Sequence, residues 1–215
     1  MVGNKNITYP DLLLVENGTA RASIVIAQKP TEKAKAAALD LQNIIKRMSG
    51  ATLPIIYDNQ NVEGALILVG SSRLTTEMGI YQPRGYPDNE RVILRRVGDR
   101  LVLLGNDDGM FTGTQFAVTM LLESLGCGWF GIDELWHVIP RRDCISVGYL
   151  NIDIAPRFES RITWVYHKNR DLALRWYQGG SCKDIEHAYW ILFPREKYFE
   201  KHPEWYCMID GERNP

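Results

Sequence analysis

The chain has 215 residues, enough for one large domain or for a medium domain with part of another. Apolar residues make up 45% and charged residues 24% of it, as in soluble globular proteins, which argues against a disordered or a membrane protein. The net charge is −1 with both signs interspersed, so neither nucleic acid nor an anionic membrane is expected as a partner.

The first predicted elements are two strands, Leu12–Val15 and Ala22–Ala27, joined by a turn at Asn17-Gly18. A helix follows from Pro30-Thr31 to Gly50, which stands where a left-handed C-cap is needed. Its apolar residues recur at helical spacing. They predict a buried stripe of Ala34, Ala37, Ala38, Leu41, Ile44, Ile45 and Met48.

Later strands are predicted from apolar runs and turn residues. They are Leu53–Tyr57, Ala65–Val69, Arg91–Val97, Arg100–Leu104 after a turn at Gly98-Asp99, and an edge strand at Cys144–Val147. A second helix is expected from Met110 to Leu125, capped by the loop at residues 106–109. Residues 1–150 are therefore predicted to form one mixed sheet with two helices packed on one face.

The composition changes after residue 150, where four of the six tryptophans and three of the four histidines lie. The Pro156-Arg-Phe158 entry followed by Ile162–Tyr166 predicts a strand. A short helix or loop at Leu172–Tyr177, an apolar run at Tyr189–Phe193, a helix at Arg195–Lys201 and a strand-like Glu204–Ile209 are expected next. Residues 151–215 are thus predicted as the beginning of a second domain.

Few residue patterns in the chain indicate chemistry. The loops after Val69 and Leu104 do not complete a phosphate-binding motif, and Asp107-Asp108 would repel a phosphate. The close acidic pairs, such as Glu196 and Glu200, are interpreted as caps or solvated charge, so no catalytic carboxylate pair is nominated. The histidines are too widely spaced to predict a metal site, and neither a metal nor a cofactor is expected.

The four cysteines are Cys127, Cys144, Cys182 and Cys207, and no pair has C-x-x-C spacing. They are interpreted as buried thiols, while a disulfide among them stays an alternative.

Four blocks of residues resemble the N-terminal domain of α-glucuronidases, and the domain that precedes the barrel in family 20 β-N-acetylhexosaminidases is similar. The blocks are Ala37–Pro54, Leu66–Gly70, Leu101–Gly109 and Leu121–Phe130. The resemblance implies an α+β fold, with two helices on a mostly antiparallel sheet, that is not catalytic and supports a (β/α)8 barrel.

Pro156-Arg-Phe-Glu-Ser-Arg161 resembles the entry to the first barrel strand of family 20 enzymes. That resemblance implies that Arg161 binds sugar hydroxyls, whereas a structural ion pair is the alternative. The family motif continues with Gly, but Ile162 stands here, which speaks against hexosaminidase specificity. With Arg161, we predict Trp164 and His187 as substrate contacts.

Tyr198–Arg213 resembles an uncharacterised, glycosidase-like barrel family that follows such domains in bacterial proteins. The resemblance implies the N-terminal part of a glycoside hydrolase, with an incomplete barrel that lacks the catalytic carboxylates and is inactive alone. Its expected partners are a carbohydrate and the rest of its own barrel.

A secreted or periplasmic location is expected, although the N-terminus has no signal peptide and a cytoplasmic location is the alternative. A non-catalytic module whose tryptophans stack on sugars is the competing interpretation.

Overall fold

The computed structural model describes residues 10–61, 63–163, 165, 168–180 and 189–213. The chain divides into two compact units, Met1–Gly180 and Ser181–Pro215, which are described separately below. The sequence placed its division at residue 150. In the structure β11 (Asn151–Ile154), just beyond that position, pairs with β6 within the first unit.

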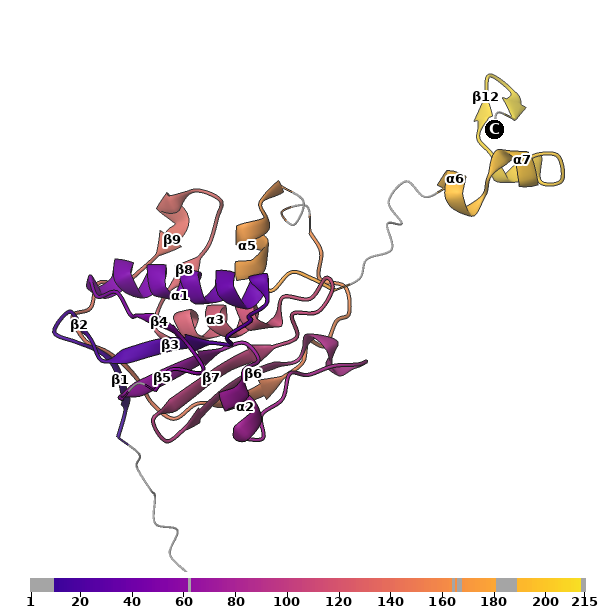
Figure 1. Ribbon diagram of the computed structural model, residues 1–215. Coiled ribbons are helices and arrows are strands. Elements are labelled where there is room, and N and C mark those ends of the chain that lie inside the picture. Colours follow the sequence, from indigo (N-terminus) through magenta and orange to yellow (C-terminus); the bar gives the residue numbers. More distant parts are fainter. Residues whose placement is uncertain (1–9, 62, 164, 166–167, 181–188, 214–215) are drawn as a thin grey trace, which may run out of the picture. The chain divides into compact units, whose positions relative to one another are not determined.

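The first unit is built on a six-stranded sheet with the order β11-β6-β7-β5-β3-β4 (Figure 1). Besides β11, its strands are β3 (Ala22–Ile26), β4 (Ile55–Tyr57), β5 (Ala65–Val69), β6 (Val92–Val97) and β7 (Arg100–Gly105). Strands β4, β3, β5 and β7 are parallel, whereas β6 and β11 are antiparallel to their neighbours. The sheet is mixed, as predicted. The expectation of a mostly antiparallel sheet is wrong for it. Connections that contain a helix carry the chain back across the sheet, so that neighbouring strands run in the same direction.

A second, three-stranded antiparallel sheet has the order β10-β1-β2, so the prediction of one sheet is wrong. The turn at Asn17-Gly18 forms as predicted, with positive φ angles of 50° and 71°. It joins β1 (Leu12–Glu16) to the short β2 (Thr19–Ala20), whereas β3 belongs to the larger sheet. The predicted last edge strand is β10 (Ile145–Val147).

Helices α1 (Glu32–Ser49) and α3 (Gly113–Ser124) pack on one face of the large sheet, as predicted (Figure 1). Every residue of the predicted α1 stripe is buried. Thr31 caps the helix by accepting a hydrogen bond from the Ala34 amide at 3.0 Å, and Gly50 ends it with φ 79°. The aliphatic layer between helices and sheet is the main core of the unit.

The starts of the two helices are held together by one buried carboxylate. Asp107 accepts hydrogen bonds from the Thr114 amide at 3.1 Å and from the Thr31 hydroxyl at 3.4 Å. Lys33 donates to three backbone carbonyls of the same loop, at Asp107, Gly109 and Phe111. The predicted capping by residues 106–109 is therefore confirmed for Asp107.

The opposite face of the sheet carries α2 (Arg73–Glu77), which the sequence analysis missed (Figure 1). It is short, and it begins with a capping box formed by Ser72 and Thr75. A smaller apolar cluster lies under it, formed by Val25, Leu68, Ile80, Ile93, Val102 and Leu104.

The unit is completed by short elements. They are η1 (Asp88–Glu90), β8 (Gly128–Trp129), η2 (Glu134–Trp136), β9 (His137–Val138) and α5 (Arg170–Arg175). The predicted strand Ile162–Tyr166 is wrong where the structure describes it, because Ile162 and Thr163 form no strand and Val165 is helical. Asn169 caps α5 by accepting a hydrogen bond from the Leu172 amide, so the chain turns into a helix here.

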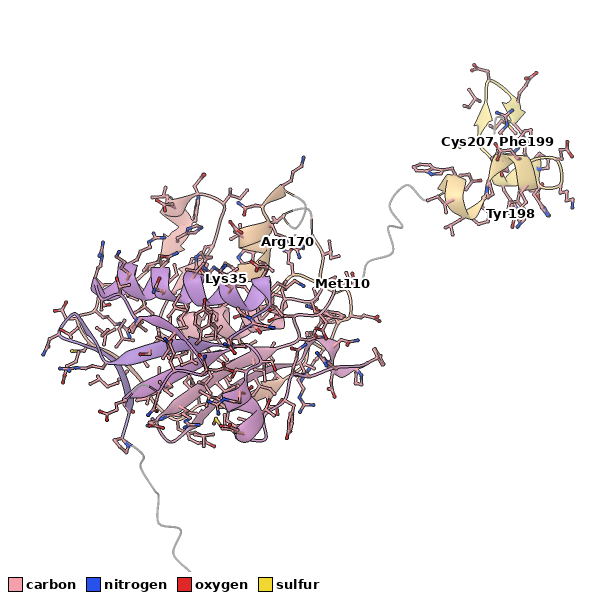
Figure 2. All side chains as sticks on the ribbon, in the orientation of Figure 1. Lys35, Met110, Arg170, Tyr198, Phe199 and Cys207 are labelled. Atoms are coloured by element: carbon pink, nitrogen blue, oxygen red, sulfur yellow. The ribbon has the colours of Figure 1, made fainter. Side chains whose placement is uncertain are left out.

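The second unit consists of α6 (Tyr189–Leu192), α7 (Arg195–Tyr198), η3 (Pro203–Trp205), β12 (Met208–Ile209) and β13 (Glu212–Arg213). The predicted helix from Arg195 forms, although it ends at Tyr198, and the strand-like prediction holds only at β12. Aromatic rings pack against one another in this unit; Figure 2 labels Tyr198 and Phe199 among them. The expected first strands of a (β/α)8 barrel are not confirmed in the described residues.

Candidate functional site

Arg161, the first predicted sugar contact, forms a nearly buried ion pair with Glu90. Its Nη2 lies 2.6 Å from Oε1 and its Nη1 lies 3.0 Å from Oε2 of the carboxylate, so the contact is bidentate. The two side chains are only 17% and 12% exposed. The ion pair that the sequence left as an alternative is therefore present.

Two further hydrogen bonds hold the same guanidinium. Nε donates to the Tyr177 carbonyl at 3.0 Å and Nη1 donates to the Phe158 carbonyl at 2.8 Å. Four of the five N–H donors of Arg161 are thus used within the protein, since Nη1 and Nη2 supply one each to Glu90. At most one donor is left for a ligand, and the role of Arg161 as a sugar contact stays a prediction.

A small hollow of about 230 Å³ opens beside this ion pair. Apart from Glu90, Arg157 and Arg161, its lining is apolar or aromatic, with Val92, Phe116, Met120, Ile154, Ala155, Pro156 and Tyr177. Burial raises the pKa of the Tyr177 hydroxyl, which donates a hydrogen bond to Glu123. The hydroxyl therefore stays neutral, and its hydrogen bond to Glu123 holds Tyr177 against α3.

The other two predicted contacts, Trp164 and His187, lie outside the described residues. The structure therefore describes only one of the three residues that the sequence nominated, and that residue is paired. Among the described residues no three His, Cys, Asp or Glu side chains gather as a metal site. In the same part of the chain no helix is both long and apolar enough to cross a bilayer.

The cysteine prediction needs correction. Cys127 is a buried free thiol as interpreted, but Cys144 and Cys207 are free and exposed, and Cys182 lies outside the described residues.

A polar groove that the sequence analysis missed runs between α1 and α5. It consists of two neighbouring hollows of about 360 and 450 Å³. Both are lined by the same four polar residues, Asp40, Asn43, Asp171 and Arg175. Trp129 and His137, a cross-strand pair of β8 and β9, also line the first of these hollows. We call this feature the α1–α5 groove.

Arg175 is the most constrained side chain of the groove. It forms an ion pair with Asp40, whose other oxygen accepts a hydrogen bond from Gln115 at 2.8 Å. The guanidinium also lies over the Trp129 ring, 4.0 Å from its centroid, as in a cation–π contact. Asp40, Gln115, Arg175 and Trp129 come from α1, α3, α5 and β8, respectively. The groove therefore forms only in the folded unit, and no local sequence motif predicts it.

Among the comparisons with known proteins, only the one with solved structures found similar proteins. No family model and no curated protein matches the chain. Among solved structures, it is similar to a family GH115 4-O-methyl-α-glucuronidase, BtGH115A, described as specific for decorated arabinogalactans. The identity is 19% and the TM-score 0.49, over 70% of this chain and 19% of that one.

Two other solved structures are also similar at low identity. The Flavobacterium johnsoniae chitobiase FjGH20 is 12% identical, with a TM-score of 0.39, over 72% of this chain and 20% of that chain. CpGH84D is 13% identical, with a TM-score of 0.35, over 56% and 20%. The chain thus spans about a fifth of the length of each of these proteins.

Proposed function

We propose that the chain is the N-terminal portion of a glycoside hydrolase that acts on a polysaccharide or oligosaccharide, in which the first unit supports a (β/α)8 barrel. By this proposal the chain does not hydrolyse alone, because in such barrels the catalytic residues come from the ends of several strands. The proposal includes a secreted or periplasmic location, and it makes the rest of the barrel a partner of this chain.

One observation supports the proposal most. The four sequence blocks that resemble the accessory domain of α-glucuronidases form α1, β5, β7 and the end of α3 with β8. These elements pack together in one core, and the two helices lie on one face of the sheet, as the resemblance implies, although the sheet is mixed rather than mostly antiparallel. The four blocks that carry the resemblance are therefore part of one packed core rather than scattered over the chain.

A non-catalytic carbohydrate-binding module is the second candidate. Two observations favour it: the α1–α5 groove, which is polar and open, and the exposed tryptophans Trp176 and Trp190, which are 39% and 64% exposed. Exposed indole rings can stack on the apolar faces of sugar rings.

Hydrolysis of a panel of oligosaccharides separates the two candidates. The polypeptide that the complete gene encodes is assayed beside the 215-residue chain, and binding of the same panel is measured for both. Turnover by the gene product and none by the chain alone is the expected result. Binding without turnover by either would favour the module, and neither binding nor turnover would contradict both.

A further inference from the structure

The α1–α5 groove has a rigid floor. Arg175 and Asp40 are 11% and 25% exposed, and each holds the other in place. Trp129 lies beneath the guanidinium, and its carbonyl accepts a hydrogen bond from the Trp176 indole at 2.6 Å. A ligand that binds here would therefore lie on a floor whose side chains are fixed before it arrives, which lowers the entropy lost in ordering that floor.

Two polar side chains that line the groove, Asn43 and Asp171, are exposed and have no side-chain partner among the residues that the structure describes. Within the described part of the chain, neither the Asn43 amide nor the Asp171 carboxylate makes a side-chain hydrogen bond or ion pair. Asn43 comes from α1 and Asp171 from the first turn of α5, so they approach the groove from two helices. Together they offer two N–H donors and several acceptor oxygens, as a hydroxyl-rich ligand requires.

The charge of the groove decides between classes of hydroxyl-rich ligand. The charge of Arg175 is neutralised by Asp40. Arg47 and Glu134, which line the same hollow, form a second ion pair with 3.7 Å between Nη2 and Oε1. Asp171 remains as an unneutralised carboxylate that lines both hollows. A uronic acid would place a second carboxylate close to it, and the repulsion would weaken binding.

We infer that the α1–α5 groove binds a neutral oligosaccharide, with Asn43 and Asp171 as the hydrogen-bonding contacts. The inference rests on the proposed function and adds to it a site and a class of sugar. The two hollows that share these residues give the groove an extended shape, which suits a chain of sugar units better than a single ring.

The test is titration of the 215-residue chain with neutral hexasaccharides of glucose, xylose, galactose and mannose, and with hexagalacturonate as the acidic probe. At least one neutral probe is expected to bind, and more tightly than hexagalacturonate. Asn43→Ala and Asp171→Ala are each expected to weaken that binding about tenfold, because each removes hydrogen bonds at the ligand. Asp143→Ala, an exposed acid away from the groove, is the matched control and should change nothing.

Asp171→Asn makes the test of charge specific. It keeps a hydrogen-bonding side chain, so neutral binding should change by less than about threefold, whereas affinity for hexagalacturonate should rise. Thermal unfolding of each variant checks that the fold is kept.

Three outcomes would overturn the inference. If a neutral probe binds and both alanine variants bind it equally well, the site lies elsewhere, although the carbohydrate function survives. If hexagalacturonate binds more tightly than every neutral probe, the class of sugar is wrong. If no probe binds, the groove is refuted, while hydrolysis by the complete gene product still decides the proposed function separately.

Discussion

The two units of the chain bury different kinds of side chain. In the first unit the largest fully buried side chains are all Leu, Ile or Met, and they lie between helices and paired strands. In the second unit aromatic rings pack edge to face, as in Phe193–Trp205 and Phe199–Tyr206, and Tyr206 is its one described buried apolar residue. The first core is shielded from water, whereas the aromatic rings of the second unit are partly exposed to it.

This difference has a physical consequence for independent stability. A segment of 35 residues, counted from Ser181 to Pro215, is below the size of about 40 at which chains usually fold without a disulfide, metal or partner. The second unit also exposes Trp190, Ile191 and Leu192, each more than half accessible. We therefore expect the first unit to determine the cooperative unfolding of the chain, and the following experiments test that comparison.

One of the two largest effects is expected from breaking the Arg161–Glu90 pair. Glu90→Ala leaves a nearly buried guanidinium without its counter-charge and should lower the free energy of unfolding by about 3 kcal/mol. Urea unfolding followed by far-UV circular dichroism measures the change. The control is Glu16→Ala, which breaks the exposed Arg21 pair and should cost less than about 1 kcal/mol.

A double variant shows whether the lost stability comes from the guanidinium that Glu90→Ala leaves unpaired. Glu90→Leu with Arg161→Met should recover most of the lost stability, since apolar residues of similar volume often replace a buried pair without cost. Equal losses for Glu90→Ala and Glu16→Ala would show that the segment 155–180 is not held on the first unit through Arg161.

Removing one aliphatic side chain compares the two cores directly. Leu41→Ala, at a position with no exposure, should destabilise the first unit by about 2–5 kcal/mol, because it leaves a cavity under α1. Trp205→Ala removes a larger side chain from the second unit, yet it should leave the main unfolding transition unchanged within about 0.5 kcal/mol. A comparable loss in that transition for Trp205→Ala would mean that the two units unfold together.

The sequence predicted what local periodicity encodes in the first unit. The α1 stripe, its cap at Thr31 and Gly50, and the hairpin of β6 and β7 all follow from spacing and turn residues. Which strands pair across the sheet does not follow from spacing, because β3, β5 and β7 are joined through distant segments. The turn at Asn17-Gly18 was predicted to join β1 directly to β3, whereas it joins β1 to β2, and β3 pairs with β4 and β5.

The candidate site was harder to predict for the same reason. Arg161 and Glu90 are 71 positions apart, and Arg175 and Asp40 are 135 apart, so no motif links the members of either pair. An unpaired acid such as Asp171 at a helix start is usually interpreted as a favourable charge at the positive end of the helix dipole. Only the juxtaposition of α1 and α5 shows that it also lines a groove.

Thiol chemistry gives a further comparison of the two cores. Burial raises the pKa of Cys127 from 9.0 to about 11, which lowers its thiolate fraction near neutral pH about a hundredfold. A chain that keeps only Cys127, with Cys144, Cys182 and Cys207 changed to Ser, should react with a disulfide reagent at least about a hundredfold more slowly folded than in urea. A chain that keeps only the exposed Cys207 should show a difference of less than about tenfold. Rapid reaction of folded Cys127 would show that the first core opens readily.

The smallest expected effect concerns the buried carboxylate that joins the starts of α1 and α3. Burial raises the pKa of Asp107 above its ordinary value of 3.8, although Thr114, Lys33 and Thr31 oppose the rise. The folded chain therefore keeps a proton that the unfolded chain has released between these two pKa values. The stability that protonated Asp107 contributes is fully present below pH 3.8 and is lost as the pH rises through the folded pKa.

Asp107→Asn removes this titration and keeps a side chain of the same shape. The amide oxygen can still accept a hydrogen bond from the Thr114 amide, so the variant should lose only about 1 kcal/mol at neutral pH. The free energy of unfolding of the natural chain relative to the variant should fall as the pH rises above 3.8 and become constant above the folded pKa. Urea unfolding of both chains across the acidic range measures this difference. An increase with pH would mean that the helix starts stabilise the charged form of Asp107 more strongly than burial disfavours it, so that electrostatics rather than apolar packing would govern this corner of the first unit.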